Sequence, residues 1–192
     1  MTGRTHDLAA LTALTAVVVL QPARTLTLTT LLLALLANQM GGIAPDIDQP
    51  TAPFWRNLPV GGMFGRVFDK LLGGHRFLTH SLLGLGLFYL LVTFGLTILH
   101  PIMPRADVGL ITWAFMIGMV SHLVMDTFTK EGVPWLLPIP VKFGFPPIKG
   151  LRITTGKKLE TLVVTPLLLV ILIWLFSSHS QFILTMLRNR LR

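Results

Sequence analysis

The sequence contains no cysteine and few charged residues. Without cysteine there are no disulfide bonds and no thiolate metal sites, so any metal ion must be held by histidine and carboxylate side chains. Charged residues make up 12% of the chain, well below the roughly 25% that is typical of soluble domains, whereas 52% are apolar and the mean hydropathy is +0.70. The sequence also lacks internal repeats and low-complexity stretches. This composition indicates a membrane protein rather than a soluble domain.

Apolar runs separate the 192 residues into recognisable helices. Residues 26–44, 82–99 and 108–125 approach or reach the ~20 residues that a bilayer span requires, and residues 162–176 form a shorter uncharged run. Residues 8–20 are the weakest candidate. We therefore predict an all-α fold, a polytopic membrane helix bundle of about five transmembrane helices that forms a single integral-membrane domain over residues 1–192. The expected ranges are 7–21, 25–44, 79–99, 107–127 and 159–177, followed by a basic C-terminal tail over 178–192.

Basic residues are distributed unevenly between the two sides of this bundle. With five spans, the N-terminus and the two long connections share one side, and the two short turns and the C-terminus share the other. The first side would carry eleven of the sixteen Lys and Arg residues and the second side five. The positive-inside rule therefore places the long connections in the cytoplasm, with the multi-pass protein in the cytoplasmic (inner) membrane. The basic tail fits poorly on the outer side, and an amphipathic surface segment is the alternative.

Histidine and acidic residues recur where the predicted helices meet the long connections. His122 and Asp126 are four residues apart, so they share one face of a helix with their side chains adjacent. The same side of the membrane holds the start of the first, third and fifth helices and the end of the second. The candidate metal ligands on this side are His6, Asp46, Asp48, His75, His80, His122, Asp126 and Glu160.

The local sequence predicts how some of these side chains converge. Pro45 disfavours the helical conformation for Ala44, so we expect the second helix to end there and Asp46 to Asp48 to continue in extended form. Alternation along an extended chain would then turn both aspartates to one side.

His75 and His80 are five residues apart, which does not place them on one face of a helix. They converge if His75 lies in a loop at the two preceding glycines, ahead of the third helix. Thr79 or Ser81 is expected to cap that helix.

Ionisable groups close to hydrocarbon are costly, and a divalent metal ion compensates that cost. Imidazole and carboxylate together favour Zn, with Mn or Fe as alternatives, and eight candidate ligands favour two or more ions, or one ion whose histidines are oriented by the remaining acids. Two such ions would activate water for hydrolysis of a phosphoester bond. In this interpretation Asp48 or Glu160 accepts the proton, and Arg76, inside the histidine motif, steadies the phosphate.

Five motifs, "GRTHDL", "APDIDQP", "GHRFLTHSLLG", "GMVSHLVMDTFTKEGVPWLLP" and "GKKLE", resemble in order and spacing those of the YdjM-like family. Members of that family are bacterial inner-membrane proteins described as metal-dependent hydrolases, one of them regulated by the LexA repressor. The family is distantly similar to zinc-dependent phospholipase C. The resemblance covers residues 3 to 175. It implies metal ligation by His6, Asp46, His75, His80, His122, Asp126 and Glu160.

One position departs from the family pattern. Gln49 follows the motif Pro-Asp-Ile-Asp where family members often have histidine, so no ligand role is assigned to it.

The expected partners are membrane lipid and a lipid-linked or phosphate-containing substrate, consistent with a site at head-group depth. The basic stretch 142–158 would contact anionic head groups or hold a substrate phosphate. The alternatives are a metal-binding transporter or sensor, a structural membrane protein, and a nuclease at the membrane surface, the last favoured only by the net charge of +8. The sequence indicates no oligomeric state.

Overall fold

The structure is a computed structural model that describes residues 1–21, 27–52, 55, 58–71, 76–139 and 141–188. Helices dominate these residues, accompanied by two isolated β-bridges in the connection after residue 127. The α-helices are α1 (Gly3–Leu20), α2 (Leu28–Ile43), α4 (Gly61–Leu71), α5 (Leu82–Leu99), α6 (Val108–Thr127), α7 (Thr165–Ser178) and α8 (Ser180–Arg188). Shorter 3₁₀ segments are Ala44–Asp48, Leu78–His80, His100–Ile102 and Lys149–Leu151, and a π-helical turn, Glu160–Val164, leads into α7.

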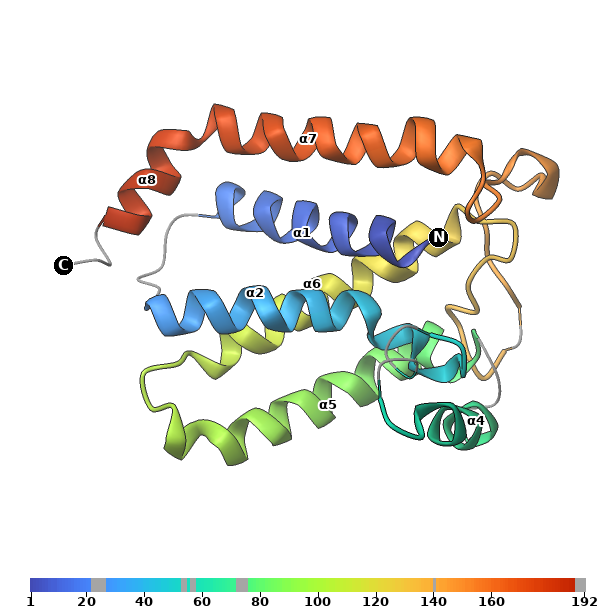
Figure 1. The fold of residues 1–192 in the computed structure, drawn as a ribbon, viewed down its shortest axis with the longest axis horizontal. Helices are drawn as coiled ribbons and strands as arrows, with labels where there is room; N and C mark the ends of the chain where they lie inside the picture. The colour runs from blue at the N-terminus through green and yellow to red at the C-terminus, as the bar shows by residue number, and fades with distance from the viewer. Residues whose placement is uncertain (22–26, 53–54, 56–57, 72–75, 140, 189–192) are drawn as a thin grey trace.

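The five long helices lie side by side and form one bundle (Figure 1). Helix α1 lies between α2 and α7, α6 packs against both α1 and α2, and α5 packs against α6. The N-terminus and both long connections lie at one end of the bundle, and the two short connections and α8 lie at the other (Figure 1). We call the first the loop end. The predicted all-α membrane bundle is confirmed, and the helix ends that carry the candidate ligands do share one end.

Four helical segments in the described part of the chain are long and apolar enough to cross a membrane. They are Leu28–Asp48, Leu82–Ile102, Val108–Thr127 and Glu160–Ser178. Helix α1 is not among them, because its first turns carry Arg4, His6 and Asp7.

The structure corrects several predicted boundaries. Helix α1 begins at Gly3 rather than residue 7, α4 lies in a connection where no helix was predicted, and the tail is helical as α8. The expected extended Asp-Ile-Asp segment is a 3₁₀ helix instead, with Ala44 in the helical region at φ −58° and ψ −38°. Pro45 lies in the first turn of this segment, where the N–H group that proline lacks would have no helical partner. The proline is therefore compatible with a helical segment that follows directly on α2.

The closest contact in the bundle joins α2 and α6 through glycine. A Cβ atom on Gly41 would lie 2.0 Å from the backbone oxygen of Phe115, and one on Gly118 would lie 2.1 Å from that of Asn38. The Asn38 side chain then donates to the Ala114 carbonyl at 3.1 Å. Small residues that allow backbones to touch, with polar side chains bonded across the contact, are how membrane helices associate without a hydrophobic driving force.

We predict that Gly118→Ala destabilises the protein by about 1–3 kcal/mol, because the added methyl group forces α2 and α6 apart. For a chain of this size the melting temperature in detergent should fall by roughly 2–4 °C per kcal/mol. Gly95→Ala in α5 is the matched control, since nothing lies within 4 Å of its Cβ position. Equal melting temperatures for the two variants would contradict this packing.

Candidate metal centre

Five of the predicted ligands meet at the loop end of the bundle. The elements that carry them are α1, the 3₁₀ segment after α2, the 3₁₀ turn before α5, and the last turns of α6. Two overlapping groups have ligand atoms within 4.8 Å of one another. These groups are His6, His122 and Asp126, and Asp46, His80 and His122.

His122 is held in one orientation by α2. Its Nδ1 lies 2.6 Å from the Gly42 carbonyl oxygen, and because a carbonyl only accepts, Nδ1 carries the proton and donates. In the neutral ring, Nε2 then presents a lone pair. This Nε2 atom is buried and has no hydrogen-bond partner among the described residues. Fixing the outer ring nitrogen on a carbonyl is the usual arrangement behind a metal-bound histidine.

His80 is supported by Asp48. The Asp48 carboxylate lies 3.3 Å from His80 Nδ1 and also accepts from the Thr79 hydroxyl at 2.5 Å and the Arg76 backbone N–H at 3.0 Å. Asp48 is fully buried behind the ring, so the structure makes it a partner of His80 rather than a member of either ligand group. Of the two predicted caps, Ser81 is the one that caps α5, by accepting from the Gly84 N–H.

The inner nitrogens of these two rings face two carboxylates. Nε2 of His80 and Nε2 of His122 lie 3.7 and 3.6 Å from Asp46 Oδ1, and 3.8 and 3.7 Å from Asp126 Oδ2. These distances are too long for a hydrogen bond. They are close to the spacing of about 3.3 Å between neighbouring ligands of a tetrahedral ion with metal bonds of about 2.0–2.1 Å. Asp46, His80 and His122, whose ligand atoms lie within 4.8 Å of one another, therefore fit a divalent cation such as zinc.

A second position beside the first involves His6. Its Nε2 lies 3.3 Å from the other carboxylate oxygen of Asp126, Oδ1, and its ring stacks on that of His122 at 3.6 Å. The α-amino group of Met1 lies here, in contact with Asp126 Oδ1 and 2.9 Å from His6 Nε2. A cationic group is thus accommodated between His6 and Asp126. Because Asp126 turns one oxygen to each position, it could serve both.

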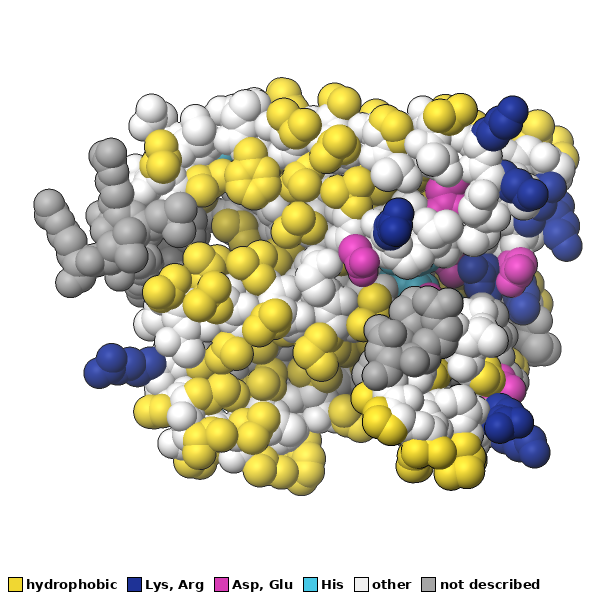
Figure 2. Space-filling model, viewed as in Figure 1, with side chains coloured by type: hydrophobic (Ala, Val, Ile, Leu, Met, Phe, Trp, Pro, Cys, Tyr) yellow, Lys and Arg dark blue, Asp and Glu magenta, His cyan; other side chains and the backbone are white. Residues whose placement is uncertain are grey.

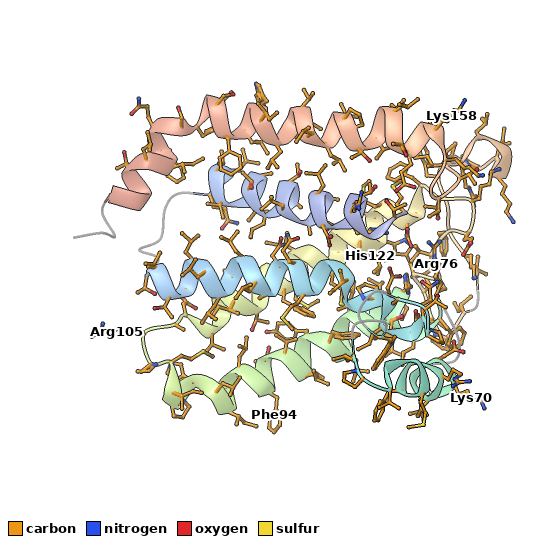
Figure 3. All side chains as sticks on the ribbon, viewed as in Figure 1. Lys70, Arg76, Phe94, Arg105, His122 and Lys158 are labelled. Carbon is orange, nitrogen blue, oxygen red and sulfur yellow. The ribbon has the colours of Figure 1, made fainter. Side chains whose placement is uncertain are left out.

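Arg76 contacts the cluster from the surface side (Figure 3). Its guanidinium pairs with Asp126 Oδ2 at 2.5 Å, donates to the Thr129 hydroxyl at 2.9 Å and lies 3.6 Å from the Glu131 carboxylate. The backbone of Arg76 is left-handed, with φ +58°, a conformation that is unfavourable for residues other than glycine. That conformation is held from both ends, since the N–H group binds Asp48 and the side chain binds Asp126.

Glu160 does not join the cluster. It is buried, and its carboxylate accepts hydrogen bonds from the Thr2 N–H and hydroxyl, the Thr5 hydroxyl and the Gly156 N–H, at 2.6 to 2.8 Å. Both oxygens are therefore used, and Glu160 joins the start of α1 to the segment before α7. This geometry suits neither the predicted metal ligand nor the predicted proton acceptor.

Sequence reasoning selected His6, Asp46, His80, His122 and Asp126 correctly as residues that come together. His75 lies outside the described residues, so its predicted role stays a prediction.

Several contacts around the cluster were not foreseen. The Gly42 carbonyl, the Thr129 hydroxyl and the Met1 amine all touch cluster residues, the hydroxyl by donating to the Asp126 backbone carbonyl. Their only sequence signal is proximity to the motifs, because backbone groups and hydroxyls occur everywhere in a chain.

Comparison with known proteins finds a family that matches nearly the whole chain. The family described as "YdjM inner membrane protein" matches residues 1–184. The chain is 31% identical to the uncharacterized protein YvsG of Bacillus subtilis over 133 residues. This aligned region covers 69% of this chain and 72% of YvsG. It is 34% identical over 116 residues to the inner membrane protein YdjM of Escherichia coli and to that of Shigella flexneri, covering 56% of this chain and 52% of theirs.

No solved structure matches the chain, so the expected similarity to phospholipase C stays a prediction. The family match over nearly the whole chain, together with the four apolar spans, identifies a membrane protein. The chain belongs to the YdjM family of inner membrane proteins.

Proposed function

We propose that this protein is a membrane-bound, metal-dependent hydrolase that cleaves a phosphoester or pyrophosphate bond in a lipid-like substrate on the cytoplasmic side. The observation that carries this proposal is the pair of inner imidazole nitrogens, of His80 and His122, facing two carboxylate oxygens at 3.6 to 3.8 Å. A divalent ion held there, zinc before manganese or iron, would supply an activated water and polarise a phosphoryl oxygen.

The residues of the chain have distinct parts in this proposal. His80 and His122 hold the ion through Nε2, and Asp48 and the Gly42 carbonyl fix the two rings from behind. Asp46 is the one member of the two ligand groups that is not fully buried, at 23% exposure. It therefore replaces Asp48 and Glu160 as our candidate for the group that accepts a proton from water.

Arg76 is placed to orient Asp126 and to bring positive charge next to the ion. Its Nε lies 3.6 Å from Glu131, which is 65% exposed, so this side of the guanidinium is close to solvent. A phosphate oxygen that displaces Glu131 would meet the same guanidinium edge. This supports the predicted part of Arg76 in steadying the phosphate.

The surroundings of the cluster favour a lipid substrate over ion transport. An apolar core that includes Phe115 and Met119 lies along α6 before His122, and Leu123 of the same core lies between His122 and Asp126. Asn38, the buried amide within α2, is bonded to a backbone carbonyl. A transport path would instead need polar groups along the bundle. Access is from the loop end, where imidazole and carboxylate side chains are seen between basic ones (Figure 2).

The cytoplasmic orientation rests on charge. Lys70 and Lys158 lie at the loop end with Arg76 and His122, whereas Arg105 lies at the opposite end (Figure 3). By the positive-inside rule, the loop end and its cluster face the cytoplasm. A substrate whose tail stays in the inner leaflet would then reach the cluster at head-group depth.

We expect the purified protein to contain one or two equivalents of zinc, manganese or iron. Removal of the metal with a chelator should lower the melting temperature, since a ligand at 100 to 1,000 times its Kd stabilises by about 3–4 kcal/mol. His122→Ala should lose most of the metal and the chelator effect. The matched control is His100→Ala, an exposed histidine at the opposite end of α5. The metal site would be overturned if wild-type protein purifies without bound metal and its melting temperature does not change when chelator is added.

Hydrolysis is tested in nanodiscs with metal-loaded protein and a panel of phospholipids, polyprenyl phosphates and pyrophosphates, and single-stranded DNA. We expect turnover of a lipid phosphate that falls to background in His122→Ala and stays at the wild-type rate in His100→Ala. Turnover of DNA alone would favour the nuclease instead. Identical profiles for wild type and His122→Ala would discard catalysis at this site.

Asp48→Asn tests the support behind His80. Loss of a carboxylate behind a metal-bound histidine typically costs 10–100-fold in metal affinity or activity. We therefore expect weaker metal binding of about that size by titration calorimetry, with the fold retained because asparagine has the same shape. Asp69→Asn in α4 is the control for loss of one carboxylate outside the cluster. Unchanged affinity in Asp48→Asn would show that His80 is not a ligand.

A further inference from the structure

Helix α4 (Gly61–Leu71) presents a separate surface that the proposed hydrolysis does not use. It lies at the loop end against the 3₁₀ segment Ala44–Asp48, and it is foreshortened in Figure 1, so that it runs across the direction of the five long helices. One side of α4 packs on the preceding segment with no room for side chains. A Cβ atom on Gly61 would lie 1.9 Å from the Trp55 backbone oxygen, and one on Gly65 would lie 2.8 Å from Pro50 Cα.

The opposite side of α4 is apolar and exposed. Its stripe has the spacing of one helical face, and its members are between 49% and 74% exposed: Met63, Phe64, Val67 and Leu71. Arg66 and Lys70 border this stripe on the same helix.

We propose that α4 lies in the plane of the membrane and docks on the anionic head groups of the inner leaflet. The apolar stripe would enter the boundary between head groups and acyl chains, and Arg66 and Lys70 would bind lipid phosphate. An amphipathic helix with basic residues beside its apolar face binds membranes in this way. Charge complementarity between these two basic side chains and lipid phosphate favours lipid over a second protein. This inference needs only that the bundle is in a membrane.

The docked helix is also connected to the candidate metal centre. Trp55, against which Gly61 and Gly65 pack, is buried and donates from its indole nitrogen to the Ile47 carbonyl at 2.9 Å. Ile47 stands between Asp46 and Asp48 in the 3₁₀ segment. Membrane docking of α4 thereby fixes the segment that carries both aspartates.

The test uses the absence of cysteine, because one introduced cysteine gives one labelled position. Full-length Val67→Cys and Phe64→Cys carry an environment-sensitive fluorophore in phosphatidylcholine nanodiscs with phosphatidylglycerol. The matched control is Gly62→Cys, which is exposed in the same helix and has nothing within 4 Å of its Cβ position. We expect the labels on the stripe to be quenched several-fold more by spin-labelled lipid, and less by iodide, than the control label.

Replacing the two basic residues tests whether they bind anionic lipid. In Val67→Cys with Arg66→Gln or Lys70→Gln, each lost charge should lower the insertion equilibrium constant about fivefold, and only when phosphatidylglycerol is present. Stripe labels that iodide reaches as readily as the control label would overturn the proposal. So would stripe labels shielded from iodide but not quenched by lipid, since a protein would then cover them. Insertion that is independent of phosphatidylglycerol would overturn the role of the two basic residues.

Discussion

The backbone contact between α2 and α6 is the constraint on which the candidate metal centre depends. Gly41 and Gly118 let the two helices approach until no side chain fits between them. Only at this separation does the Gly42 carbonyl reach His122 and fix which of its nitrogens faces inward. In a membrane, where lipid is as apolar as leucine, small residues and polar bonds across the contact supply the association that hydrophobic burial supplies in water. The close packing of α2 and α6 therefore also sets the orientation of the His122 ring.

Buried charge explains why the loop end is held together so closely. Three carboxylates, from Asp46, Asp48 and Asp126, lie among imidazole rings, and the Arg76 guanidinium and the Met1 amine both pair with Asp126. Unpaired charges at such a position are costly. The arrangement is consistent with a site that gains stability from a divalent ion. The same requirement accounts for the strained backbone of Arg76, which serves two aspartates at once.

The family assignment and the geometry bear on function in different ways. Membership in the YdjM family establishes an inner membrane protein, and its named relatives are known only as uncharacterized or inner membrane proteins. The ligand cluster carries the proposed chemistry independently of them. Its position at the loop end, with basic residues around it, favours a substrate that stays partly in the bilayer.

The sequence alone determined the helical membrane class, the shared end of the bundle and most of the residues that gather in the candidate cluster, because hydropathy and the i, i+4 spacing of His122 and Asp126 are local properties. It did not determine what stands behind each ligand. Asp48 and Glu160 look like equivalent carboxylates in sequence, yet one supports His80 and the other is saturated by Thr2, Thr5 and Gly156. Hydrogen-bond partners far apart in the chain decide such roles, and only the tertiary structure brings them together.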